Sequence, residues 1–414
     1  MLKLPRALRL YRNLSPSFYR VFTAQLLLTF VQTAFLLIFN LLLKKNGYTD
    51  LQIGTYTSVQ YLGVLLLAFP LGFILRGRRI RPFFLVSGLL TPLISLAVLE
   101  CVVHRWDGLL YVALFLWGMG FVSFQIGVLP WLLRNTSSHV RTEAIAFLYT
   151  NFSMSQLLAG AAIWGLTVGM EWDEYRVLQV ISLLGLLSPM LCFSIRENAP
   201  EQEAFTLRNA KALFFKGYDW PRIGRVLLPN TFLTIGAGLT MPFMNLFFYV
   251  TYGIDSDDYS LLSIATAIAV VIGTLYIARI RRQFGYRIAI TLSQVPAVAL
   301  LAGMALVSLE PEWAFAMPLA LAFFLLRQPL MHSAVPMTRE LMLLHAGERN
   351  REMVSSLVSS IRSGTYVFSA QLFGLMRGNG AGFPLILLTT AVLYGLGVIM
   401  YYRLIVSYER GSSE

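Results

Sequence analysis

The sequence predicts an all-α membrane protein with twelve transmembrane helices, arranged as two six-helix halves related by a parallel pseudo-repeat. Of its 414 residues, 57% are hydrophobic and only 13% are charged, whereas an ordinary soluble domain carries about 25% charged residues. Apolar runs long enough to cross about 30 Å of hydrocarbon as a helix recur along the whole chain. The second half also repeats features of the first.

The apolar runs place the membrane spans. The basic segment from Lys3 to Arg20 leads into a long apolar stretch without a small-residue cleavage site, which predicts a retained first helix and not a cleaved signal. The expected spans are 20–43, 52–75, 83–103, 109–133, 144–168, 175–195, 226–250, 259–279, 287–308, 313–338, 353–376 and 383–404.

The longest polar stretch separates the two halves. We interpret residues 196–225 as a cytoplasmic linker between an N-terminal half, residues 1–195, and a C-terminal half, residues 226–414. Within the linker, the segment NAKALFFKG is compatible with an amphipathic helix on the membrane surface or with irregular chain.

The basic residues set the orientation. With these spans, 26 Lys and Arg residues lie on the side that holds both termini and the linker, and 5 lie on the other side. Lys and Arg concentrate on the cytoplasmic side of membrane proteins, so we expect both termini to be cytoplasmic and the protein to be integral to the plasma membrane. The same asymmetry explains the net charge of +12 without a nucleic-acid partner.

An internal repeat relates the halves. Asn40 and Asn245 each precede a glycine by seven or eight residues, and the basic runs RGRR and RIRR follow the second and eighth spans. Further on, Glu143 corresponds to Glu352. Because each half contains an even number of spans, the repeat is parallel, and such folds place the substrate cavity between the halves near the midplane.

These features resemble the major facilitator superfamily over nearly the whole chain. The resemblance rests on the six-plus-six layout, the linker, the NGYTDLQIG loop and the basic loops after the second and eighth spans. The family's loop signature is matched here by GFILRGRR, which begins at Gly72 and lacks the usual Asp. The resemblance implies a cytoplasmic gate, for which the candidates are Arg76, Arg78, Arg79, Glu143, Arg279, Arg282 and Glu352.

Polar side chains inside the spans are the candidates for substrate binding, because such groups are costly in a membrane and usually face a cavity or a partner. Arg327 lies midway along the tenth span, followed by Gln328 and two prolines. A guanidinium matches a carboxylate or phosphate in two-point geometry. Arg327 is therefore a candidate anion site, although a purely structural role, with its charge satisfied by carbonyls or another helix, stays open.

Further polar residues within the spans are also candidates either for substrate binding or for a structural role. Arg362 in the eleventh span is a second cationic site or part of the cytoplasmic gate, and His332 is a titratable group close to Arg327. Asn40, Asn245, Gln32 and Gln125 are expected to line the cavity or to form hydrogen bonds between helices.

Together these observations predict a secondary transporter that moves a small solute by alternating access. The acidic residues all fall in loops or at span ends, which favours an anionic or amphipathic solute over a cation, and we expect an exporter. A lipid flippase on the same fold and a non-transporting receptor or assembly partner are the alternatives. No nucleotide-binding, hydrolase or metal motif occurs, so we expect no enzyme activity, no cofactor and no metal. We expect a monomer whose partners are its solute and membrane lipids.

Overall fold

The computed structural model describes residues 14–75, 78–137, 140–198, 218–347 and 350–411. Two compact units make up the chain. Unit 1 consists of Met1–Leu42 and Val59–Leu213, and unit 2 consists of Leu43–Ser58 and Phe214–Glu414. The boundary therefore falls inside two helices, because residues 43–58 belong to unit 2 although they lie in the N-terminal half of the sequence.

Unit 1 is built from helices that run up and down with short connections. They are α2 (Pro16–Lys45), α3 (Asp50–Ile74), α4 (Arg81–Val103), α5 (Asp107–Asn135), α6 (Arg141–Met170), α7 (Glu174–Gly185) and α8 (Ser188–Phe193), of which the end of α2 and the start of α3 belong to unit 2. Aromatic side chains of α2, α4 and α5, among them Phe18, Phe84 and Trp131, form the buried core near the start of α2.

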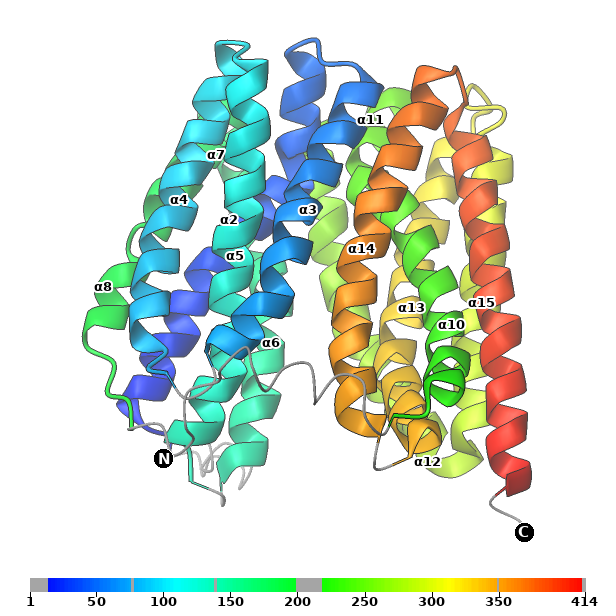
Figure 1. Cartoon of the computed structure of the whole chain (residues 1–414). Helices are drawn as coiled ribbons and strands as arrows, with labels where there is room; N and C mark the ends of the chain where they lie inside the picture. Colours follow the sequence, from blue (N-terminus) through cyan, green and yellow to red (C-terminus); the bar gives the residue numbers. More distant parts are fainter. Residues whose placement is uncertain (1–13, 76–77, 138–139, 199–217, 348–349, 412–414) are drawn as a thin grey trace, which may run out of the picture. The chain divides into compact units, whose positions relative to one another are not determined.

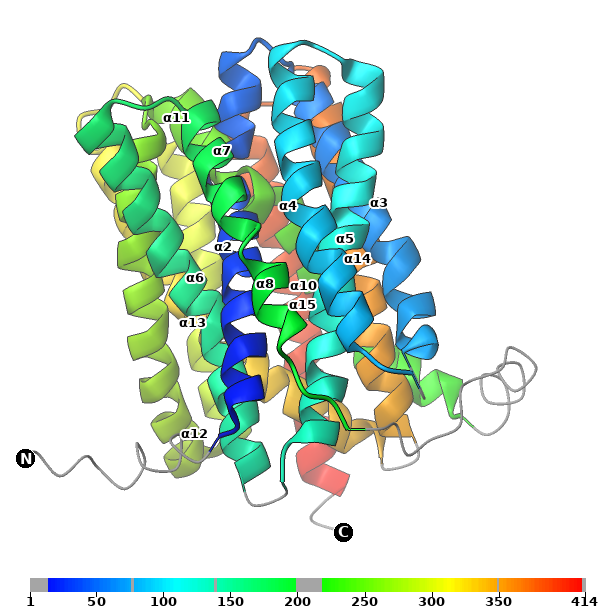
Figure 2. The same ribbon diagram turned by 90° about the vertical axis from the view of Figure 1, so that its left-hand side faces the viewer.

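The sixth expected span, 175–195, is broken and not one helix. It consists of α7 and α8, separated at Leu186 and Leu187, and both pieces pack on α4 (Figure 2). Pro189 follows the break, and a proline removes one backbone donor and clashes with a continuing helix. The expected span is confirmed at Glu174–Phe193, with a turn near its middle.

Unit 2 contains the remaining helices. They are α10 (Trp220–Thr240), the 3-10 turn η2 (Met241–Phe243), α11 (Met244–Tyr252), α12 (Ser256–Val307), α13 (Ala316–Ala346), α14 (Arg351–Gly378) and α15 (Phe383–Gly411). Helix α10 packs on both α14 and α15, and α12 packs along α13 (Figure 1).

In unit 2, the seventh expected span is confirmed but contains an irregular turn, and one expected loop differs from the prediction. The seventh span, 226–250, changes from α10 to the 3-10 turn and then to α11, with Pro242 inside the turn. The expected basic loop between spans 259–279 and 287–308 is helical apart from Gly285, whose φ of 77° and ψ of −179° break the helix. Only glycine adopts this backbone region readily. The linker segment NAKALFFKG lies outside the described residues.

The expected membrane-spanning helices are otherwise confirmed. Each of the expected spans lies on helical segments of the structure. In the described part of the chain, nine helical segments are both long and apolar enough to cross a membrane. Helices α3, α13 and α14 are not among these nine, and in α14 several serines and Arg362 interrupt the apolar residues.

The carboxylate of Glu197 caps the start of α4 in unit 1. The two oxygens of Glu197 accept hydrogen bonds from the backbone N–H groups of Ile80 and Arg81, at 2.7 and 3.0 Å. The first N–H groups of a helix have no partner within the helix, and a carboxylate there also complements the helix dipole.

We therefore expect Glu197→Ala to lower the stability of unit 1. Loss of a capping carboxylate costs about 0.5–2 kcal/mol, which a thermal unfolding experiment in detergent would detect as a lower midpoint. The neighbouring Arg196→Ala provides the control, because the Arg196 side chain is exposed. Equal midpoints for the two variants would contradict this role of Glu197.

Candidate functional site

The most unusual side chain of unit 2 is Arg327. It lies on α13, eleven residues after Ala316, and at about 1.5 Å per residue this is about 17 Å from the start of the helix. Only 1% of the residue is exposed. By strict distance and angle, none of its three guanidinium nitrogens makes a hydrogen bond to a described residue, although the Tyr394 side chain lies close enough to interact with the charge as a weak hydrogen-bond partner. The structure thus encloses a guanidinium group without fully satisfying it.

An aromatic ring is the neighbour that the structure gives this charge. The guanidinium carbon of Arg327 lies 5.4 Å from the ring centroid of Tyr394 on α15. Tyr394 is itself buried, eleven residues after the first residue of α15. A cation over an aromatic ring is stabilised by about 0.5–2 kcal/mol, which is less than the cost of enclosing the charge.

Small residues on α10 make room for this arrangement. A Cβ atom on Gly236 would lie 2.9 Å from two ring carbons of Tyr394, and one on Gly238 would lie 2.9 Å from the Cβ atom of Ser369. The hydroxyl of Ser369 also donates a hydrogen bond to the carbonyl oxygen of Ile235, at 2.8 Å. Helix α10 therefore approaches α14 and α15 closely at the level of Tyr394.

The break between α10 and α11 lies next to Arg327. Gln328 is buried, and its side-chain nitrogen lies 3.9 Å from the sulfur of Met241 in η2. Asn245, buried in the first turn of α11, accepts a hydrogen bond from the backbone N–H of Leu246. Irregular backbone at membrane depth occurs where protein or water covers it.

Two further basic residues lie near the middle of their helices and are accessible to solvent. Arg362 on α14 and His332 on α13 are exposed, and the charges of Arg327 and Arg362 both act on His332. The guanidinium carbon of Arg362 lies 5.8 Å from the ring centroid of Tyr366. We call Arg327, His332 and Arg362 the midspan basic cluster.

Helix α14 carries a polar stripe that leads toward this cluster. Ser355, Ser359 and Arg362 are all exposed and follow one another at helical spacing, and Tyr366 continues the same face. Arg362 lies eleven residues after Arg351, where α14 begins. A lipid-facing stripe of this kind would be costly, so the stripe indicates a side of α14 that meets water.

No carboxylate in the described part of unit 2 forms an ion pair with the midspan basic cluster. Asp50 and Asp255, which form ion pairs with other residues, lie at helix ends. The two arginines of the cluster therefore bring positive charge without an ion-pair partner among the described carboxylates.

The other expected substrate residues belong to unit 1. Asn40 is buried on α2, Gln32 on the same helix is partly buried, and Gln125 on α5 is exposed. Their part in binding stays a prediction.

The expected cytoplasmic gate is described only in part. Arg76 lies outside the described residues, and Arg78 and Arg79 are exposed. Glu143 and Glu352 lie in the first turns of α6 and α14, as expected from the sequence, and Arg279 and Arg282 lie within α12. The structure does not describe the side chains of these last four residues, so the gate also stays a prediction.

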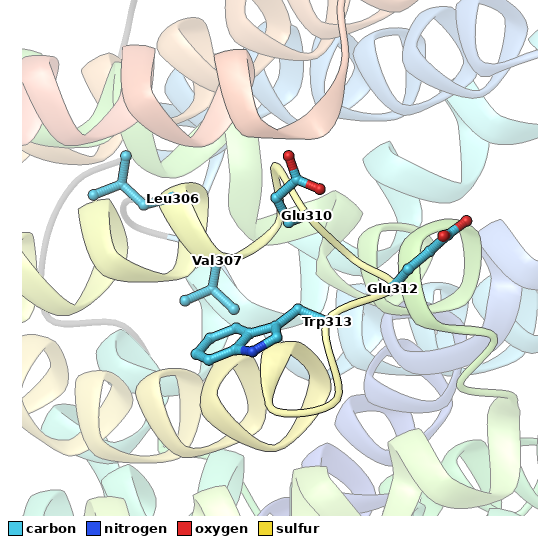
Figure 3. A pocket seen from close by; sticks show the side chains of 5 residues that line it. All are labelled: Leu306, Val307, Glu310, Glu312 and Trp313. Carbon is cyan, nitrogen blue, oxygen red and sulfur yellow. The ribbon is translucent and has the colours of Figure 1, made fainter.

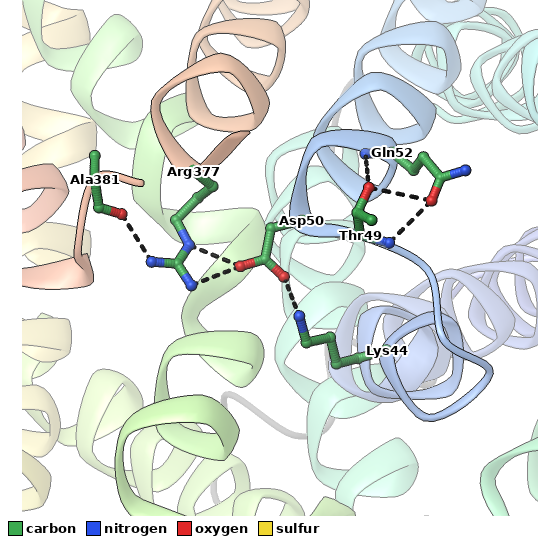
Figure 4. A network of polar contacts seen from close by, with 6 residues as sticks. All are labelled: Lys44, Thr49, Asp50, Gln52, Arg377 and Ala381. Atoms are coloured by element: carbon green, nitrogen blue, oxygen red, sulfur yellow. Dashed lines mark hydrogen bonds and ion pairs between the residues drawn. The ribbon is translucent and has the colours of Figure 1, made fainter. Parts of the chain in front are cut away.

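The sequence analysis missed an ion-pair network in unit 2. It lies where α2 ends, α3 begins and α14 ends. Asp50 pairs with Lys44 and with Arg377 (Figure 4). The signal available in the sequence was the acidic residue of the NGYTDLQIG loop together with the scarcity of basic residues on that side. Asp50 and Arg377 are 327 positions apart in sequence, so their spacing does not predict that they pair.

One open hollow lies at the turn between α12 and α13. Leu306, Val307, Glu310, Glu312 and Trp313 line it, with a volume of about 600 Å³ (Figure 3). The figure shows both carboxylates on the turn itself. This hollow differs in charge from the midspan basic cluster and has no part in the site.

Comparisons with known proteins agree with the helical layout. The model of the family described as Major Facilitator Superfamily matches residues 21–370. The structure is similar to that of a D-xylose–proton symporter, with 13% identity, a TM-score of 0.71 and coverage of 93% of this chain and 96% of that chain.

Two further solved structures are similar. A bacterial homologue of the iron transporter ferroportin in an inward-facing state has 15% identity and a TM-score of 0.73, covering 94% of this chain and 98% of that one. The nucleoside transporter NupG has 10% identity and a TM-score of 0.68, covering 95% and 99%. At these identities the likeness concerns the fold alone. No curated protein matches the sequence.

The close approach of Gly236 to Tyr394 leads to a paired prediction. Gly236→Ala should destabilise unit 2 by about 1–3 kcal/mol, because an added methyl group overpacks the ring. Gly395→Ala, next to the same tyrosine, meets nothing within 4 Å and should be neutral or slightly stabilising, since alanine favours a helix over glycine. Thermal unfolding of both variants tests this, and a Gly236→Ala midpoint at or above that of Gly395→Ala would refute the packing argument.

Proposed function

Since the chain belongs to the Major Facilitator Superfamily, we propose that it is a secondary transporter that exports a small anionic or amphipathic compound by alternating access, with Arg327 as its principal anion-binding group. The family and the helical fold make it a membrane transporter. The charge, the direction and the site are the proposal.

The observation that carries the proposal is the buried guanidinium of Arg327, which makes no strict hydrogen bond to a described residue. A charged side chain near the middle of a membrane helix costs about 2.5–3.5 kcal/mol on insertion scales. A stable protein offsets such a cost with a partner, and Tyr394 supplies only a weak one. A bound carboxylate or phosphate would supply two charge-assisted hydrogen bonds to the guanidinium edge.

The distribution of the other charges supports an anion over a cation. Arg362 adds to the positive potential near Arg327, and Asp50 and Asp255, which form ion pairs, lie at helix ends. A cationic substrate would meet repulsion here without a compensating group.

The position of the polar stripe supports approach from the cytoplasm. Ser355, Ser359 and Arg362 lie in the half of α14 that begins at Arg351, and the sequence places that helix start on the strongly basic side. We propose that this side is cytoplasmic and that the protein resides in the plasma membrane as a monomer. A substrate moving along this stripe would reach Arg362 before Arg327.

The first experiment is a thermal-stability screen of the purified protein with benzoate, citrate and inorganic phosphate, and with tetraphenylphosphonium as the cation. An anion at about 100 times its dissociation constant stabilises the folded state by about 2.7 kcal/mol. We expect at least one anion to raise the unfolding midpoint of the wild type and not that of Arg327→Gln. Arg403→Gln is the matched control, because it removes an exposed arginine near the end of α15.

Other outcomes of the screen would contradict the proposal. Stabilisation by tetraphenylphosphonium alone would favour a cation transporter, and equal anion responses in wild type and Arg327→Gln would make Arg327 structural. Selective stabilisation by an anionic phospholipid would move the lipid flippase ahead.

Arg362→Gln should weaken anion binding without abolishing it. Removing one exposed cation near the bound charge lowers affinity by about tenfold, because the interaction is partly screened by water. Calorimetric titration with the anion found in the screen measures this, and Arg362→Lys should retain most of the affinity. An unchanged dissociation constant in Arg362→Gln would assign Arg362 to a gate and not to the binding path.

A further inference from the structure

Arg362 is a second arginine of unit 2 whose surroundings are similar to those of Arg327. Its guanidinium carbon lies 5.8 Å from the ring centroid of Tyr366, and that of Arg327 lies 5.4 Å from the ring centroid of Tyr394. Among the described residues, no carboxylate forms an ion pair with either arginine. Each charge is therefore placed against an aromatic ring, which stabilises a cation less than a carboxylate does.

The two arginines lie in the same region of unit 2. Tyr366 and Tyr394 are close enough to interact electrostatically, and the charges of Arg327 and Arg362 both act on His332. These five side chains come from α13, α14 and α15, and α13 packs on both of the other helices. All three helices belong to unit 2, so the arrangement does not involve unit 1.

The positions of the two arginines in their helices give their separation along the helix axes. Helix α13 ends at Ala346 and α14 begins at Arg351, so the two helices run in opposite directions from neighbouring ends (Figure 1). Arg327 lies 19 residues before Ala346, and Arg362 lies 11 residues after Arg351. At about 1.5 Å per residue, the Cα atoms of the two arginines differ by about 12 Å in level.

The side chain of Arg362 reduces this separation. Its guanidinium contacts the ring of Tyr366, which lies four residues further along α14 and so about 6 Å nearer to the level of Arg327. The guanidinium of Arg327 stays near its own level, because Tyr394 lies eleven residues into α15, as Arg327 does in α13. The two guanidinium groups are therefore separated by a distance that a short chain of atoms can bridge.

We propose that the solute carries two separated anionic groups, as a dicarboxylate does, and that one group binds Arg327 while the other binds Arg362. This rests on the proposed function, in which Arg327 binds an anion, and it adds the substrate class. Each guanidinium offers parallel N–H donors that match one carboxylate. The pair of arginines therefore selects both the number of anionic groups and the distance between them.

Charge balance distinguishes this class of solute from a monoanion. Arg327 and Arg362 place two positive charges in one region of unit 2, and a single carboxylate compensates only one of them. Tyr366 and Tyr394 are both buried, and a tyrosine hydroxyl brings no negative charge at neutral pH. Arg362 is exposed, so the second anionic group can reach it from water.

Calorimetric titration with matched anions tests the number of anionic groups. Adipate and glutarate carry two carboxylates joined by a short chain. Hexanoate matches adipate in length but has one carboxylate, and malonate matches its charge but holds the two carboxylates close together. We expect the wild type to bind adipate or glutarate at least about tenfold more tightly than hexanoate or malonate, because only the longer dianions form charge-assisted hydrogen bonds with both arginines.

Arg362→Gln tests the second anionic group by itself. This variant should weaken adipate binding by about tenfold more than hexanoate binding, since hexanoate interacts with Arg362 only at long range. Arg362 is exposed, so the substitution leaves the packing of α14 intact. Arg403→Gln, which removes another exposed arginine, should change neither affinity. Equal losses of adipate and hexanoate affinity in Arg362→Gln would overturn the inference.

The titrations separate this inference from the proposed function. If the wild type binds adipate, malonate and hexanoate equally and Arg327→Gln binds none of them, the site takes one anionic group, so the inference fails and the proposed function stands. If Arg327→Gln binds all of them as the wild type does, or if the wild type binds none, both fail. Cardiolipin, a lipid with two phosphates, is titrated in lipid nanodiscs. Binding of cardiolipin that depends on both arginines, without binding of any dicarboxylate, would overturn the dicarboxylate class in favour of a lipid.

Discussion

The rest of unit 2 depends on the uncompensated charge of Arg327. A guanidinium that is 1% exposed and makes no strict hydrogen bond to a described residue is a costly feature in a membrane protein. Its surroundings reduce the cost only in part, through the ring of Tyr394. This remaining cost is the reason for our proposal that the substrate is anionic, which rests on this residue and not on the fold.

The helix breaks and small residues of unit 2 shape the space around that charge. The 3-10 turn at Met241–Phe243 interrupts a membrane helix beside Gln328, and Gly236 allows α10 to reach Tyr394. Near Asp50, Gly54 of α3 and Gly374 of α14 bring two helix backbones into contact. In both places glycine allows a helix backbone to approach its neighbour closely. The helices therefore contact each other through backbone atoms and a few polar groups.

The midspan basic cluster and the ion-pair network of Asp50 differ in whether their charges are balanced by other side chains. The midspan basic cluster leaves cations without carboxylates and so favours a ligand that brings negative charge. The ion-pair network of Asp50, Lys44 and Arg377 matches a carboxylate with two cations, so these charges need no ligand to balance them.

The sequence by itself determined the helical membrane fold, since hydrocarbon thickness fixes the length of each apolar run and the basic residues mark one side. It also identified Arg327, His332 and Arg362, because charge within an apolar run is visible in one dimension. Apolar content did not reveal the breaks at Leu186 and Met241 or the helical backbone between spans eight and nine, which depend on local proline and glycine geometry. Only the tertiary structure decided that Arg327 lies against Tyr394 and that Asp50 pairs with Arg377, because the partners are distant in sequence and meet through helix packing.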